Sequence, residues 1–341
     1  MSEFFFSYGL FIAKVITGLI AFIFVVAIVG GARKKDEGPE LKVTNLNEKY
    51  KSLKMRLLES VMDKKEYKQH IKEEEKNSKK EAKASKNNKP KPKLFVLDFE
   101  GDIKASQVET MRDEITAMLS IAEPQDEVLL TLDNSGGIVH EHGLAASQLT
   151  RIKDANLNLT VSVDKVAASG GYMMACVADK VVAAPFAILG SIGVLAQLPN
   201  FHRLLDKAGI DFEQHTAGEY KRTVTMFGKN GEKEREKLKI DLQETHTLFR
   251  DFVTENRNKL DIEKVATGEH WYGKQALELN LVDELKTSDE LLIDALDVFD
   301  IYQINTQVKQ DIKDRLFGGL FASIDTAFNK LTNAQNESKY H

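Results

Sequence analysis

Short apolar segments alternate with amphipathic segments along the middle of the chain, and this alternation restricts the possible folds more than any other feature. Four segments are short, apolar and typical of buried strands: 94–99, 127–132, 157–163 and 180–184. Helical patterns fill the intervals at 106–121 and 144–152. Strands separated by helices of this length require parallel crossovers. The sequence therefore predicts an α/β body built on a mostly parallel, buried sheet.

The chain after this body continues with mixed patterns. A long charged amphipathic helix is predicted over 232–258, and a second αβ-like stretch over 271–285. Residues 181–198 carry no charge over 18 positions, which is the length of a membrane span. Pro185 and two glycines interrupt this run, and a strand pattern leads directly into it. We interpret it as buried sheet and loop.

The apolar run at residues 9–31 predicts a transmembrane anchor behind a short tail at residues 1–8. Its 23 residues contain one charge, Lys14, and as a helix they would span about 34 Å, enough for a hydrocarbon core of roughly 30 Å. No basic segment precedes the run and no convincing cleavage site follows it, which favours an uncleaved anchor over a signal peptide. Because Arg33, Lys34 and Lys35 follow at once, charge bias would place the body in the cytoplasm.

Residues 32–93 are predicted to connect the anchor to the body. Apolar residues at helical spacing over 46–61 indicate an amphipathic helix, which packs on the body or pairs with a copy of itself. Residues 63–93 contain 12 Lys against 6 acidic residues, typical of a solvated tether, which could also rest on anionic headgroups. The net charge of the whole chain is −5, so composition gives no reason to expect nucleic acid as a partner.

Two motifs of small residues are candidates for catalytic chemistry. Asn134-Ser135-Gly136-Gly137 follows the second strand, where α/β sheets hold ligands, and its glycines could present bare N–H groups to an oxyanion. Ser169 stands between two alanines and two glycines, a pattern typical of a tight strand-to-helix turn that exposes a nucleophilic hydroxyl. An ordinary loop and an N-cap serine are the structural alternatives.

A nucleophilic serine needs a base, and the sequence offers histidine or lysine. His140 and His142 follow the glycine motif, although an H-x-H at a helix start is more often exposed. Lys221 lies in a loop that could fold back over the sheet edge, and a lysine base must be neutral, which requires burial. The single cysteine, Cys176, cannot form an internal disulfide and is predicted to be a buried thiol.

Five ordered motifs resemble those of the signal peptide peptidase SppA family of Ser/Lys proteases. They occupy residues 134–137 (NSGG), 168–176 (AASGGYMMA), 190–194 (GSIGV), 218–223 (GEYKRT) and 268–285 (GEHWYGKQALELNLVDEL). The resemblance implies a ClpP/crotonase-like α/β superhelix of βαβ units over 94–300. A helical extension and polar tail would follow at 301–341. Members of this fold commonly assemble into rings or stacked oligomers, so a homo-oligomer is expected. Because the chain has one Ser motif and one Lys motif, we expect one folded unit to contain a complete site, with completion by neighbouring subunits as the alternative.

The same resemblance implies a role for each matching residue. Ser169 would be the nucleophile, Lys221 the general base, and Ser191 the residue that orients the lysine. Backbone N–H groups at Gly136 and Gly170 would form the oxyanion hole. No metal or organic cofactor is implied.

The expected function is a membrane-anchored serine endopeptidase of the bacterial inner membrane that cleaves signal peptides or other membrane-associated polypeptides. One alternative is a catalytically silent scaffold of the same fold that binds membrane proteins. Another is a crotonase-like acyl-thioester enzyme, against which the set Ser169, Ser191 and Lys221 argues. The side of the membrane stays open, because the basic residues point the body inward whereas the family role is associated with the outer side.

Overall fold

The computed structural model describes residues 2–31, 40–85 and 90–307. The chain divides into two compact units, one of residues 1–40 with 307–341 and one of Leu41–Thr306. The basic residues 33–35 and the polar tail predicted after the last strand lie outside the described residues. The second unit contains the sheet and the candidate site.

Helix α1 (Ser2–Gly31) is the described helix of the first unit and contains the apolar run predicted as an anchor. Its described side chains, such as Phe6, Phe11 and Leu19, are exposed, and most side chains after Leu19 lie outside the described residues. Within the described part of the chain, no helix is both long enough and apolar enough to span a membrane. The anchor at 9–31 therefore stays a prediction.

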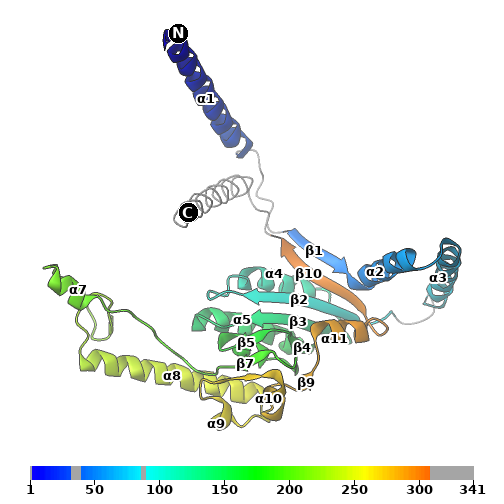
Figure 1. Ribbon diagram of the computed structural model, residues 1–341. Coiled ribbons are helices and arrows are strands. Elements are labelled where there is room, and N and C mark those ends of the chain that lie inside the picture. Colours follow the sequence, from blue (N-terminus) through cyan, green and yellow to red (C-terminus); the bar gives the residue numbers. More distant parts are fainter. Residues whose placement is uncertain (1, 32–39, 86–89, 308–341) are drawn as a thin grey trace, which may run out of the picture. The chain divides into compact units, whose positions relative to one another are not determined.

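A ten-stranded sheet forms the centre of the second unit (Figure 1). Its main path runs in the order β1-β10-β2-β3-β4-β6-β9, and the pairs from β10 to β9 are parallel. These strands are β1 (Glu40–Asn45), β2 (Lys93–Gly101), β3 (Glu127–Asn134), β4 (Asn158–Val163), β6 (Lys180–Ala183), β9 (Glu284–Leu285) and β10 (Asp300–Gln307). The predicted mixed α/β fold with a mostly parallel sheet is confirmed.

Three short strands leave this path and carry the chain toward the candidate site. β5 (Val166–Ala168) pairs with β3 and with β7 (Ile188–Gly190), and β8 (His270–Tyr272) pairs antiparallel with β7. Residues 181–192 are mostly buried and include β6 and β7, as predicted for the uncharged run at 181–198, but its end is not buried, since Leu195 and Leu198 are exposed. Strands of three residues have too few positions for an alternating pattern, so the sequence did not define the bounds of β5 or β7, although it predicted a strand before Ser169 and sheet within 181–198.

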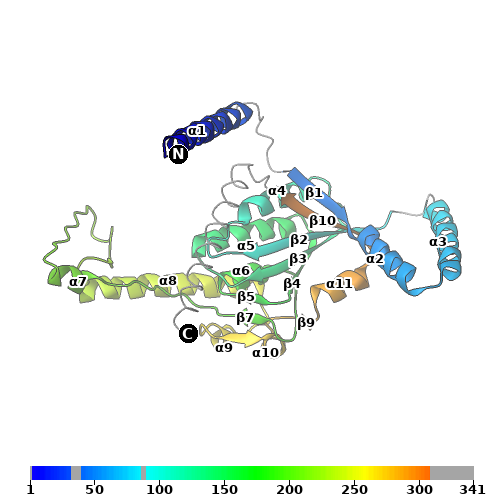
Figure 2. The ribbon, with the colours of Figure 1, turned by 45° about the horizontal axis from the view of Figure 1, so that its top comes forward.

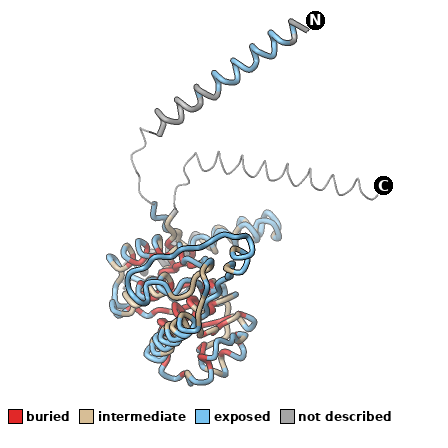
Figure 3. Tube along the Cα trace, turned by 90° about the vertical axis from the view of Figure 1, so that its left-hand side faces the viewer, coloured by how far each residue is buried: buried red, intermediate tan, exposed pale blue. Residues whose placement is uncertain are grey.

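Helices cover one face of the sheet and enclose the larger core. Phe95, Leu97 and Phe99 alternate along β2 toward this face, where they meet buried residues of the helices. Figure 2 shows these helices beside the sheet, and Figure 3 shows buried residues in the interior of the unit. The helices are α4 (Val108–Leu119), α5 (Val139–Asp154), α6 (Gly170–Ala175) and α8 (Glu232–Asn256).

The opposite face is covered by α2 (Leu46–Val61) and α11 (Ser288–Ala295). Leu46 and Leu292 pack with Val96 and Leu129 in a smaller core. The first turn of the predicted amphipathic helix thus packs on the body, whereas Leu57 near its end is 65% exposed. Helix α3 (Lys64–Ser85) follows it through most of the predicted tether.

Peripheral elements complete the second unit. Helix α7 (His202–Lys207) lies near the end of α8 that points away from the sheet (Figures 1 and 2). Helices α9 (Ile262–Val265) and α10 (Gly273–Glu278) lie near the other end of α8. The predicted helical extension begins instead with strand β10, which pairs with β2 from Asp300 onward.

Candidate active site

Ser169 occupies the turn between β5 and α6 with a backbone that residues bearing a Cβ rarely adopt. Its φ is 53° and its ψ is −118°. The Ser169 N–H donates to the carbonyl of Gly190 at 2.7 Å, and its carbonyl accepts from Met173 at 3.0 Å. All six residues of α6 are buried, while Ser169 is half-buried. The fold thus holds a strained serine at the accessible end of a buried helix.

The loop after β3 lies directly against this turn. Gly136 has a φ of +84°, and a Cβ at this position would lie 2.7 Å from the Ala168 carbonyl oxygen and 2.8 Å from both Ser169 Cβ and Gly170 N. Such contacts exclude any side chain at position 136. The structure therefore brings together Gly136, Ser169 and Gly170, the three residues to which the resemblance assigns the nucleophile and the oxyanion hole.

A buried polar pair fixes the glycine loop from behind. The Gly136 N–H donates to Asn134 Oδ1 at 2.6 Å, so this donor is engaged within the loop. His142 Nε2 lies 3.2 Å from the same oxygen, and Nδ1 lies 2.9 Å from the Ile138 carbonyl. Both Asn134 and His142 are almost fully buried. The His142 ring thereby supports the loop through Asn134.

This placement separates the two histidines that the sequence offered as bases. His140 is exposed, and its Nε2 lies 3.6 Å from Glu141 Oε1. His142 is buried, and both of its ring nitrogens contact acceptors other than Ser169. The expectation that an H-x-H at a helix start is exposed holds for His140 alone. Sequence reasoning missed Asn134 and His142 as supports of the loop, and no periodic signal distinguishes them.

Ser191 lies at the strand next to the Ser169 turn. Ala168 and Gly190 are register partners in β5 and β7, so Ser169 and Ser191 each follow a paired residue. Ser191 also has a positive φ, 52°, and its N–H donates to the carbonyl of Glu269 at 2.6 Å. The structure therefore places Ser191 beside the turn that holds Ser169.

Lys221 lies apart from this cluster within the chain. The nearby residue Glu219 forms an ion pair with Lys233, with Oε1 and Nζ 2.7 Å apart. The Lys237 ammonium lies 5.4 Å from the centroid of the Tyr220 ring. These lysines belong to the first half of α8, whereas the buried residues of α8, Phe249 and Val253, lie near its end. The 12 residues from Lys237 to Phe249 correspond to about 18 Å of helix. Lys221 is exposed, and the chain alone does not bring it to Ser169.

Comparison with known families covers most of the chain. The model for Peptidase family S49 N-terminal matches residues 3–149, and the model for Peptidase family S49 matches residues 151–298. The "Probable protease SohB" of Haemophilus influenzae is 46% identical over 317 residues, which are 90% of each chain. The chain belongs to peptidase family S49. The resemblance drawn from the five motifs is thereby confirmed.

Two further relatives agree with this assignment. "Probable protease SohB" of Buchnera aphidicola subsp. Acyrthosiphon pisum is 47% identical, over 95% of this chain and 96% of the relative. Its counterpart in Buchnera aphidicola subsp. Schizaphis graminum is 51% identical, over 84% and 85% of the two chains. A solved structure titled 1510-N membrane-bound stomatin-specific protease aligns with a TM-score of 0.40 at 13% identity, covering 61% of this chain and 86% of that one.

Tyr172 and Cys176, which follow the Ser169 turn, are fully buried. The Tyr172 hydroxyl donates to the Leu281 carbonyl at 2.9 Å. Burial raises the pKa of Cys176 to about 12, so its thiol stays protonated and unreactive. The prediction of a buried thiol is confirmed. Among the described residues, no group of three or more His, Cys, Asp or Glu side chains could hold a metal ion.

Proposed function

We propose that this S49 peptidase is a serine endopeptidase with Ser169 as its nucleophile. The observation that carries the proposal is the strained Ser169 turn, against which Gly136 packs so closely that no side chain fits between them. In the proposed reaction, Ser169 Oγ attacks the peptide carbonyl carbon and loses its proton to a base. The acyl-enzyme then forms as the amine leaves, and water releases the acid.

The proposed oxyanion hole uses backbone N–H groups around the turn. Gly170 follows Ser169 at the first position of α6, where N–H groups have no partner within the helix. Gly136 is the second proposed donor, and its N–H has to exchange Asn134 Oδ1 for the oxyanion. Such donors stabilise the charge that develops on the carbonyl oxygen, by about 3 to 4 kcal/mol each.

We propose Lys221 as the general base, supplied to Ser169 of one subunit by a neighbouring copy, with Ser191 orienting its neutral amino group. The segment that carries Lys221 has exposed apolar residues, among them Leu195, Leu204 and Ile210, which are 76%, 63% and 55% exposed. We propose that these side chains are covered by a neighbouring copy, because apolar patches on a protein surface are typical of interfaces. Docking there would also desolvate a lysine, which a base working near neutral pH requires.

The proposed location is the bacterial inner membrane, with residues 9–31 as a single-pass anchor. The support is the length and apolar character of that run in the sequence. An anchor would hold the peptidase unit close to signal peptides and other membrane-associated polypeptides and raise their effective concentration. We propose these polypeptides as substrates of a homo-oligomer with a ClpP/crotonase-like body.

Mixing inactive variants tests the shared site. Ser169→Ala and Lys221→Ala are each expected to lower peptide cleavage by the full chain by about a thousandfold or more. When the two variants are co-expressed and co-assembled, mixed oligomers should regain part of the activity, because one subunit supplies the serine and another the lysine. Full activity of either variant alone would contradict the assigned chemistry. Absence of rescue would contradict the shared site only.

The separation of Lys221 from Ser169 favours a second candidate, a catalytically silent scaffold that binds membrane polypeptides with the same body. An exposed lysine far from the serine would leave the hydroxyl without a base. The two candidates differ in one assay, since the scaffold retains polypeptides without cleaving them. Cleavage of a model peptide by the wild-type chain, lost in Ser169→Ala, excludes the scaffold.

A further inference from the structure

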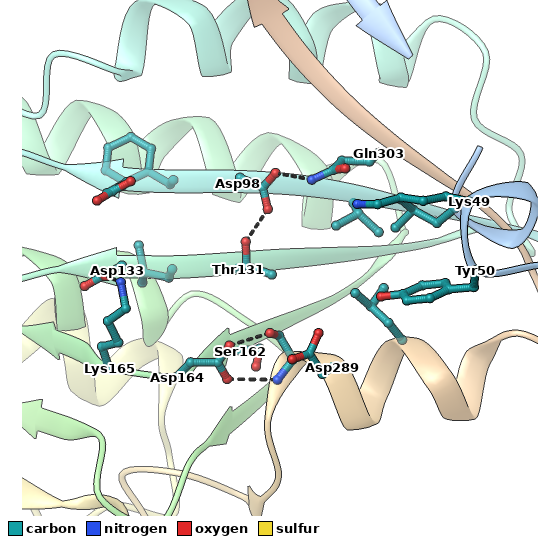
Figure 4. Close-up of a pocket in the computed structure, with 17 residues that line it drawn as sticks. Lys49, Tyr50, Asp98, Thr131, Asp133, Ser162, Asp164, Lys165, Asp289 and Gln303 are labelled. Atoms are coloured by element: carbon teal, nitrogen blue, oxygen red, sulfur yellow. Dashed lines mark hydrogen bonds and ion pairs between the residues drawn. The ribbon is translucent and has the colours of Figure 1, made fainter. Parts of the chain in front are cut away.

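A pocket of about 500 Å³ lies on the face of the sheet that α2 and α11 cover. Figure 4 shows its floor on strands β2, β3 and β4, with Lys49 and Tyr50 of α2 on one side and Asp289 of α11 on another. None of its lining residues belongs to the Ser169 turn, the Gly136 loop or the segment of Lys221. It is a feature separate from the candidate active site.

The floor of the pocket is polar where the strands would otherwise continue an apolar core. Asp98, Thr131 and Ser162 are register partners on three neighbouring strands and form one row across the sheet. Earlier residues of the same face, such as Val96 and Leu129, are buried and apolar. The switch from apolar to polar residues occurs toward the carboxyl ends of the strands, where parallel sheets hold ligands.

Ser162 lacks a partner in this row. The Asp98 carboxylate accepts hydrogen bonds from the Thr131 hydroxyl and, at 2.6 Å, from Gln303 Nε2. Ser162 is 1% exposed, and its Oγ has no hydrogen-bond partner among the described residues. Figure 4 shows it at the pocket, near Asp164 and Asp289. A buried hydroxyl without a partner is costly, which indicates that a ligand group completes it.

The charges of the pocket define the chemistry of that ligand. The lining contains five carboxylates and two ammonium groups, a formal net charge of −3. Within the described chain, the ion pair inside the pocket is Asp133 with Lys165 at 2.8 Å. Asp98 and Asp289 have no cationic partner among the described residues. Burial and the Asp289 charge both raise the pKa of Tyr50, which places that negative charge close to an aromatic ring.

We propose that this pocket binds an aliphatic ammonium ion, with the charge on the Asp98 and Ser162 row and the carbon chain along Tyr50 and Leu292. Carboxylates and a hydroxyl accept hydrogen bonds from an ammonium group, and an aromatic ring with apolar neighbours suits a methylene chain. Two sources share this chemistry, a free polyamine and a lysyl side chain of a polypeptide. The proposal does not depend on the peptidase mechanism.

Calorimetric titration of the full chain with spermidine at low salt tests the pocket. The wild type is expected to bind at one saturable site. Asp98→Asn should weaken binding by about tenfold or more, because a charge-assisted hydrogen bond is lost. Asp289→Asn, at an exposed position, should also weaken it if Asp98→Asn proves unstable. Ser162→Ala should weaken it by about fivefold without a change of charge.

Asp251→Asn is the matched control, since Asp251 is exposed on α8 and carries the same charge. Its affinity should equal that of the wild type. No saturable binding, equal weakening in the control, or displacement of spermidine by Mg²⁺ at the same concentration would overturn the proposal. Titration with Nα-acetyl-lysine methylamide, which keeps a free ε-ammonium group, separates the two sources. Tighter binding of this probe identifies a lysyl side chain as the ligand, and tighter binding of spermidine identifies a polyamine.

Discussion

Ser169 and Gly136 each have a positive φ, and the loop that contains Gly136 packs against the turn that contains Ser169. For a serine this conformation costs on the order of 1–3 kcal/mol, so the surrounding contacts must hold it. Those contacts are the hydrogen bond to Gly190 and the close approach of the Gly136 loop, which Asn134 and His142 fix from behind. Changes at Gly136 should therefore act on the geometry of Ser169.

Gly136→Ala is expected to lower both stability and peptide cleavage. The added Cβ would meet the Ala168 carbonyl oxygen at 2.7 Å in a backbone region that alanine disfavours, at a cost of about 1–3 kcal/mol. Gly143→Ala is the matched control, because a Cβ there meets nothing within 4 Å inside helix α5. Gly143→Ala should raise stability by up to about 1 kcal/mol. Denaturant unfolding measures the stability of the two variants, and peptide cleavage rates measure their activity. Equal changes in Gly136→Ala and Gly143→Ala would contradict the role of Gly136 in holding the Ser169 turn.

Glu114→Gln is expected to stabilise the fold near neutral pH. Burial raises the pKa of Glu114, while its Oε1 accepts the Thr306 N–H at 2.7 Å, a bond that glutamine can keep. The ionised carboxylate therefore opposes folding increasingly as pH rises from its unfolded pKa through its folded pKa. Unfolding free energies of the two proteins should converge near pH 4 and separate above it. A difference independent of pH would contradict the assignment.

At the scale of elements, sequence patterns predicted the longer strands and helices and missed the bounds of the shortest strands. The apolar strands at 94–99 and 127–132 and the helices between them were predictable, because alternation and helical spacing extend over enough residues. The three-residue strands β5 and β7, which position Ser169 and Ser191, left no such pattern. The position of Lys221 depends on tertiary contacts of its neighbours with α8, which no local pattern encodes.

Asn47→Ala is expected to release helix α2 from the body. The Asn47 amide donates to the carbonyls of Leu296 and Phe299, and its oxygen accepts the Ile301 N–H at 2.7 Å. Loss of these three bonds should cost about 2–3 kcal/mol. Hydrogen exchange should then accelerate in α2 and at Ile301. Glu59→Ala, at an exposed position of the same helix, should leave exchange unchanged, and acceleration in both variants would contradict the role of Asn47.

At the scale of the whole molecule, the single chain assembles half of the proposed chemistry. It brings Gly136 and Ser191 beside the turn of Ser169 and Gly170, and it leaves Lys221 exposed on a segment with exposed apolar residues. Under the proposed mechanism a second copy supplies the base, so activity should require assembly. Dilution that dissociates the proposed oligomer should therefore reduce cleavage per chain.

The most direct measurement is mass mapping of the full chain after reaction with a fluorophosphonate, which labels activated serines. The account predicts one adduct, on the peptide that contains Ser169, and its loss in Lys221→Ala as well as in Ser169→Ala. An adduct on another serine, or undiminished labelling of Ser169 in Lys221→Ala, would contradict it.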